Sequence, residues 1–177
     1  MKKLAVCLML SLLLILYGCS GKAETVWETV DDELPAAEVS YLDEAYSIKY
    51  DVPEDAVVET FSPASGRSIR EHPDGDYAIT SEVFLSSGAE ETIRRLSGFE
   101  PEELRVVMTE RYGMPEYQFA WYAGGDEGGY LYRTDVLMDD LYCYALTFGV
   151  REGLGNAYDS TSEQVFSSFS LFYDEGV

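Results

Sequence analysis

The chain has 177 residues and a formal net charge of −21, with 33 acidic residues against 12 basic ones. This acidity argues against nucleic-acid binding and against electrostatic docking onto anionic lipid headgroups, because both need clustered Lys and Arg. An apolar fraction of 46% and an aromatic fraction of 14% exclude a disordered chain, and the length suits one ordinary domain.

Residues 1–18 are predicted to form a lipoprotein signal peptide. Lys2 and Lys3 give a positive start, and the apolar run over 4–17 has the length of a secretory segment but is short for a membrane-spanning helix. The run ends in Leu16-Tyr17-Gly18-Cys19, which resembles the lipobox of bacterial lipoproteins. The resemblance implies cleavage before Cys19 and a lipid on Cys19, which would place the protein on the extracytoplasmic face of the cell membrane. An ordinary signal peptide or an uncleaved anchor is the alternative.

Residues 19–39 are predicted to be an acidic tether, because the stretch is rich in Asp and Glu and Pro35 interrupts any helix. Its like charges repel one another and extend the segment away from the membrane. The remaining segment, 40–177, is predicted to be a single globular domain.

The first half of this domain is predicted to hold three strands. Apolar side chains alternate over 46–50, and strands are also expected over 56–61 and 77–85. The composition of residues 62–66 predicts a loop, and that of 73–76 predicts a turn.

Two helices are predicted from the spacing of capping residues. Ser87 and Glu90 stand three apart before an amphipathic stretch that Gly98 is expected to end. Ser160 and Glu163 repeat the spacing before the last apolar segment of the chain.

An antiparallel meander is predicted between the two helices, with strands over 104–112, around 117–121, and over 130–138 and 141–150. The last strand has bulky side chains on one face and small uncharged ones on the other, which indicates burial on both sides. The order of elements predicts an α+β fold in which helices flank an antiparallel sheet.

The C-terminal motifs resemble those of a known family. Residues 142–148 read Tyr-Cys-Tyr-Ala-Leu-Thr-Phe, and 166–169 read Phe-Ser-Ser-Phe. Both are similar to the closing strand and helix of Mog1/PsbP-like domains. The resemblance covers about residues 40–173 and implies an α/β/α sandwich. It implies no activity and no site residues, because the family serves unrelated roles on one fold.

Few residues have the chemistry that catalysis or metal binding needs. Cys143 is predicted to be a small core residue, and His72, the one histidine, a solvated loop residue. We therefore expect no catalytic residue, no metal site and no cofactor. Asp74 and Asp76 flank a glycine, but their spacing does not match a calcium loop.

Ten aromatic residues lie between 112 and 148, and most are expected in the core. Tyr130 and Tyr132, beside a loop with four glycines, are predicted to be the most exposed and to bind a ligand. The sequence therefore predicts a non-enzymatic binding module whose partner presents a neutral or basic surface. The alternative is a small extracytoplasmic hydrolase that depends on carboxylates, which would need a cleft holding two acids with raised pKa values.

Overall fold

The computed structural model describes residues 29–30, 45–62, 66–125 and 128–173. The predicted signal peptide and Cys19 lie outside these residues. Among the described helices, none combines the length and the apolar character that crossing a bilayer requires.

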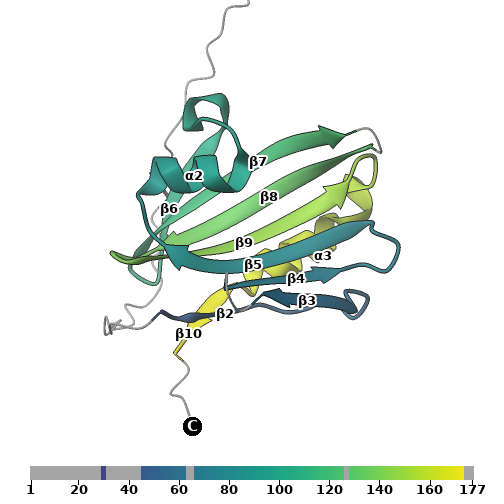
Figure 1. Ribbon diagram of the computed structural model, residues 1–177, viewed down its shortest axis with the longest axis horizontal. Helices are drawn as coiled ribbons and strands as arrows, with labels where there is room; N and C mark the ends of the chain where they lie inside the picture. Colours follow the sequence, from purple (N-terminus) through teal and green to yellow (C-terminus); the bar gives the residue numbers. More distant parts are fainter. Residues whose placement is uncertain (1–28, 31–44, 63–65, 126–127, 174–177) are drawn as a thin grey trace, which may run out of the picture.

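The centre of the molecule is an eight-stranded sheet, shown face-on in Figure 1. All neighbouring strands are antiparallel except the short β1, which runs parallel to β6. Across the sheet the strands are β1 (Thr29–Val30), β6 (Val106–Arg111), β7 (Met114–Gly125), β8 (Gly128–Met138), β9 (Tyr142–Arg151), β5 (Tyr77–Leu85), β4 (Arg67–Glu71) and β3 (Val58–Ser62). A separate antiparallel pair joins β2 (Ser47–Lys49) to β10 (Ser170–Phe172).

Two helices lie on opposite faces of this sheet. In Figure 1, α2 (Ala89–Ser97) crosses the near face at one end of β6, β7 and β8, and α3 (Gly155–Ser167) lies behind the sheet. A short 3₁₀ helix, η2 (Pro101–Glu103), connects α2 to β6. This arrangement confirms the predicted α+β class with helices flanking an antiparallel sheet.

Side chains alternate between the two faces and build two cores. The α3 face packs Tyr77, Leu146 and Phe148 against Val165 and Phe166. The α2 face packs another set around Ile93 of the helix: Val106, Phe119, Val136, Cys143 and Ala145. The two sets meet in β9, so its predicted burial on both faces is confirmed.

The predicted N-terminal caps are wrong at both helices, although α2 begins at Ala89. Gly88, with φ 94°, precedes α2, and no side chain caps it. Helix α3 begins at Gly155, five residues before the predicted cap at Ser160. A reciprocal capping box forms instead between Glu100 and Glu103 of η2. The predicted end of α2 is confirmed, because Gly98 adopts the left-handed conformation there.

Several strands differ from the sequence prediction. Strands β4 and β10 were missed, and the two residues of β1 fall within the segment predicted to be a tether. The turn between β6 and β7 lies at Tyr112 and Gly113, which have φ of 58° and 74°. A turn with two positive φ values matches the twist of a hairpin, so β7 begins directly after it, at Met114.

Candidate functional site

Helix α2 covers only part of its sheet face, and a hollow of about 290 Å³ lies beside it. Four strands of the sheet centre and the adjacent β4 contribute to it, together with the last turn of α2. The side chains that line the hollow are Arg67, Thr80, Glu82, Leu96, Trp121, Ala123, Tyr132 and Thr147.

A row of aromatic rings runs beneath this hollow along β7 and β8. Trp121 stacks on Phe119 at 5.6 Å and on Tyr132 at 5.1 Å between ring centroids. Tyr130 continues the row at 6.0 Å from Tyr132. A Cβ atom on Gly149 of the neighbouring strand would lie 2.5 Å from the Tyr132 ring, so the glycine makes room for this ring.

The structure brings the two predicted ligand-binding tyrosines together on this face. Both are half-buried, and the Tyr130 hydroxyl donates a hydrogen bond to the Gly75 carbonyl at 2.8 Å. The prediction that they are the most exposed of the ten aromatics is wrong, because Tyr122 is 47% exposed. Tyr122 lies on the other face of β7, where its hydroxyl donates to Glu152 at 2.8 Å. Burial raises the pKa of Tyr132, so its hydroxyl is a neutral donor and acceptor at physiological pH.

Charged and hydroxyl groups surround the aromatic row. Arg67 and Glu82 stand opposite each other on β4 and β5, and Glu82 also pairs with Arg95 of α2 at 3.5 Å. Thr147 shares a hydrogen bond of 2.7 Å with the buried Thr134. The hollow therefore offers a positive side chain, a negative side chain and a hydroxyl group next to aromatic surface. These hydrogen-bond donors and acceptors suit an uncharged polar ring.

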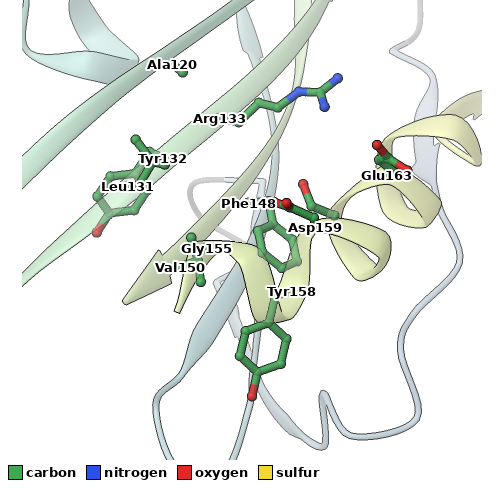
Figure 2. Close-up of a pocket in the computed structure, with 11 residues that line it drawn as sticks. Ala120, Leu131, Tyr132, Arg133, Phe148, Val150, Gly155, Tyr158, Asp159 and Glu163 are labelled. Atoms are coloured by element: carbon green, nitrogen blue, oxygen red, sulfur yellow. The ribbon is translucent and has the colours of Figure 1, made fainter. Parts of the chain in front are cut away.

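The opposite face carries a second cavity, of about 230 Å³, between α3 and the sheet. Figure 2 shows its apolar floor, formed by Leu131, Phe148 and Val150. Asp159 and Glu163 line it from α3.

A third cavity, of about 270 Å³, shares Arg133 and Glu163 with this one and extends it along α3. Its other lining residues are Arg111, Gln118, Asp135, Phe166 and Ser167. The two cavities are therefore neighbours along α3, and together they are called here the α3 groove, with an apolar end and a polar end.

Asp135 is the most deeply buried charged group in the α3 groove, with a side chain only 1% exposed. Its Oδ1 atom accepts no hydrogen bond from the described residues. The nearest cation, Arg133 Nε, is 3.6 Å away, beyond hydrogen-bonding distance. Burial raises the pKa of Asp135 to about 7, and Arg133 only partly offsets this effect.

A neighbouring carboxylate, Glu116, is also buried but has close partners. Arg111 lies 2.7 Å from Oε1, and the Thr109 hydroxyl donates to Oε2 at 2.5 Å. Arg111 also donates to the Phe169 carbonyl at 3.2 Å, just beyond the end of α3. This network joins the C-terminal end of α3 to β6 and β7.

His72 and Cys143 both lie away from solvent. His72 is not solvated: its side chain is 15% exposed, its ring packs against Tyr77 at 5.4 Å, and its Nε2 lies 3.8 Å from Asp55. Cys143 is confirmed as a core residue, fully buried with its Sγ 3.2 Å from the Thr92 hydroxyl.

The candidate calcium residues do not converge on a cation site. Asp76 binds Arg151 and accepts a hydrogen bond from the Tyr158 hydroxyl at 2.9 Å. In the described part of the chain, no group of three acidic, His or Cys side chains is arranged to hold a metal ion.

Sequence reasoning missed the polar residues of the α3 groove, although a signal was present. Glu116 and Gln118 stand two residues apart in β7, and Arg133 and Asp135 stand two residues apart in β8. Each pair therefore lies on one face of the sheet, the face that packs against α3. Charged residues at inward-facing positions of central strands are uncommon and mark a candidate site.

Comparisons with known proteins give the fold but no family. No family model matches the sequence, and no curated protein matches it. Among solved structures, LpqN of Mycobacterium tuberculosis, described as involved in cell envelope biogenesis, has a TM-score of 0.51 at 9% identity. The match covers 73% of this chain and 85% of LpqN, so the two share a fold.

Two other solved structures are similar with lower scores. A protein from Bacteroides thetaiotaomicron has a TM-score of 0.47 at 12% identity, over 74% of this chain. This chain spans less than half of that protein, 46% of its length. The cyanobacterial PsbP of Synechocystis has a TM-score of 0.45 at 14% identity, over 78% of this chain and 99% of that one.

Proposed function

We propose that this protein is a lipid-anchored extracytoplasmic binding module without catalytic activity, and that its ligand lies in the hollow beside α2. The single observation that carries the proposal is the row of stacked rings from Phe119 to Tyr130, in which Trp121 and Tyr132 line the hollow among polar side chains. The fold shared with an envelope protein is consistent with this role.

The ligand class follows from the lining of the hollow. Carbohydrates present apolar C–H faces that pack on aromatic rings, and hydroxyl groups that exchange hydrogen bonds with both donors and acceptors. Tyr132 and Trp121 supply the rings, and Arg67, Glu82 and Thr147 supply the polar partners. Because Arg67 and Glu82 are of opposite charge, the hollow favours a neutral saccharide over a strongly charged ligand.

Isothermal titration calorimetry of the purified full-length protein against neutral hexose and N-acetylhexosamine tetrasaccharides tests this assignment. We expect Tyr132→Ala to weaken binding at least tenfold, because it removes a ring that lines the hollow. Leu131→Ala is the matched control: the neighbouring side chain points to the opposite face and is 48% exposed. Equal affinity of the two variants would place the ligand elsewhere.

The anchor is tested separately, because Cys19 lies outside the described residues. Metabolic labelling with a fatty-acid analogue should label the wild-type protein and leave Cys19→Ser unlabelled. Equal labelling of both proteins would remove the lipid from the proposal and leave the binding site untouched.

A second function, carboxylate-dependent hydrolysis, is favoured by one observation, the raised pKa of Asp135. An acid that keeps its proton near neutral pH is suited to general acid catalysis. The burial of Asp135 opposes this role, since a catalytic acid must reach its substrate. Turnover of an extracytoplasmic hydrolase substrate that Asp135→Asn abolishes would establish the enzyme over the binding module.

A further inference from the structure

The α3 groove lies on the face of the sheet that the proposed function does not use. Arg133 and Glu163 line both of its cavities, so a cation and an anion stand at the junction of the apolar and polar ends. Among the described residues, no ion pair joins Arg133 to Glu163. A positive and a negative side chain therefore both line the junction without forming an ion pair with each other.

Arg133 is held in place but keeps donors for a ligand. Its guanidinium lies over the Phe166 ring at 4.2 Å, and its Nε faces Asp135 at 3.6 Å. The side chain remains 43% exposed. A guanidinium has five N–H donors, and its planar fork matches a carboxylate in two parallel hydrogen bonds. In the described part of the structure, these donors face the groove without a hydrogen-bonded anion.

The wall opposite Arg133 is acidic. Asp159 and Glu163 stand four residues apart on α3, one helical turn, and Figure 2 shows both on the side of α3 next to the cavity. Like charges at this spacing repel one another and destabilise a helix. A positive group placed between them would relieve that repulsion.

Asp135 provides the independent sign of a built site. Its buried Oδ1 atom has no hydrogen-bond donor among the described residues, although its side chain lines the groove. Buried polar atoms of this kind are rare and call for an explanation. Here the carboxyl group lies at the polar end of the groove, with its Oδ1 atom 3.6 Å from Arg133 Nε.

The apolar end of the α3 groove indicates that the ligand carries an apolar group. Leu131, Phe148 and Val150 form an apolar floor, and Tyr158 adds aromatic surface from α3. The cavities of about 230 and 270 Å³ together fall within the range of small-molecule sites, roughly 300 to 1,000 Å³.

We propose that the α3 groove binds a free α-amino acid with a large apolar side chain. The carboxylate lies on the Arg133 guanidinium, and the ammonium lies between Asp159 and Glu163. The side chain packs on the floor formed by Leu131, Phe148 and Val150. A zwitterion satisfies both charges at once, whereas a plain cation or a plain anion leaves one of them without a partner and meets repulsion from the other.

Calorimetric titration of the purified full-length protein with three matched probes tests the proposal. L-leucine carries both charges, leucinamide lacks the carboxylate, and N-acetyl-leucine lacks the ammonium. We expect saturable binding of L-leucine and at least tenfold weaker binding of each analogue. No binding of millimolar L-leucine, or equal binding of leucinamide, would overturn the proposal. This comparison uses the wild-type protein throughout and changes only the probe, so its result does not depend on whether a variant folds.

Variants then assign the residues. Arg133→Gln and Glu163→Gln should each weaken L-leucine binding at least tenfold. Glu90→Gln removes the same charge from α2 on the opposite face and should leave L-leucine binding unchanged. If Glu163→Gln and Glu90→Gln behave alike, the ligand is not in this groove. Arg67 lines the hollow beside α2 and neither cavity of the α3 groove. Arg67→Gln should therefore keep L-leucine binding while it weakens saccharide binding, so failure of one proposal is distinguishable from failure of the other.

Discussion

At the scale of single residues, Asp135 is the side chain whose surroundings most affect its chemistry. Its pKa is raised from 3.8 to about 7. Between these values the native state keeps a proton that the unfolded chain has lost. The contribution of Asp135 to the free energy of unfolding therefore falls as pH rises from about 4 to 7, and the loss persists at higher pH.

Replacing Asp135 by Asn removes this dependence, because Asn does not ionise. We expect the stability of Asp135→Asn relative to wild type to increase between pH 4 and pH 8, by roughly 1 to 4 kcal/mol. Urea unfolding at a series of pH values measures the difference, in which the other titrating groups largely cancel. Parallel pH curves for the two proteins would contradict the burial of an ionisable Asp135.

Gly149 is required by the Tyr132 ring that lies over it. In Gly149→Ala, the new Cβ would lie 2.5 Å from a ring carbon of Tyr132, and the ring must move. We expect a loss of roughly 1 to 3 kcal/mol in the free energy of unfolding, as for other overpacked sites. Gly155→Ala is the control, since a Cβ there meets nothing within 4 Å. Equal destabilisation of the two variants in urea would show that the ring contact is not the cause.

Cys143 should react slowly with a bulky thiol reagent in the native protein. Its side chain is fully buried, and burial raises the pKa of its thiol, so the reactive thiolate is scarce. In a Cys7→Ser, Cys19→Ser background Cys143 is the remaining cysteine. Its labelling rate should increase by orders of magnitude in denaturing urea, and a native rate as fast as the denatured rate would contradict its place in the core.

At the scale of elements, Arg111 links the end of α3 to the sheet. It pairs with the buried Glu116 and donates to a backbone carbonyl at the end of the helix. Arg111→Ala leaves Glu116 buried without its cation, so we expect a loss of about 3 to 5 kcal/mol in stability. The double variant Arg111→Met, Glu116→Leu should recover most of this loss in urea unfolding. If the double variant is no more stable than Arg111→Ala, the buried charge is not what destabilises the single variant.

Strands were more predictable than helix caps, for a physical reason. Strand β9 was recognised because its bulky and small side chains alternate, so that each face of the strand shows its own pattern of burial. Helix α3 begins before its predicted cap because its first turn is held by tertiary contacts. Tyr158 packs on Tyr77 at 4.9 Å between ring centroids and donates a hydrogen bond to Asp76. These contacts join residues about 80 positions apart, and no local pattern reports them.

At the scale of the whole molecule, the sheet decides which residues meet. The hollow beside α2 joins Arg67, Glu82 and Tyr132 from three strands, and their register brings them together. Sequence alternation was enough to nominate Tyr130 and Tyr132, but it could not show that Tyr130 is engaged with Gly75. The polar end of the α3 groove escaped notice because acidic residues are common in a chain of net charge −21.

The central claim, that a saccharide binds in the hollow beside α2, is tested most directly by the fluorescence of Trp121. In a Trp27→Phe background Trp121 is the remaining tryptophan, and it lines the hollow in stacked contact with Tyr132. Titration with a neutral tetrasaccharide should give a saturable change in its emission, lost in Tyr132→Ala and retained in Leu131→Ala. Emission that stays constant across the neutral tetrasaccharides tested, or that changes equally in both variants, would contradict the claim.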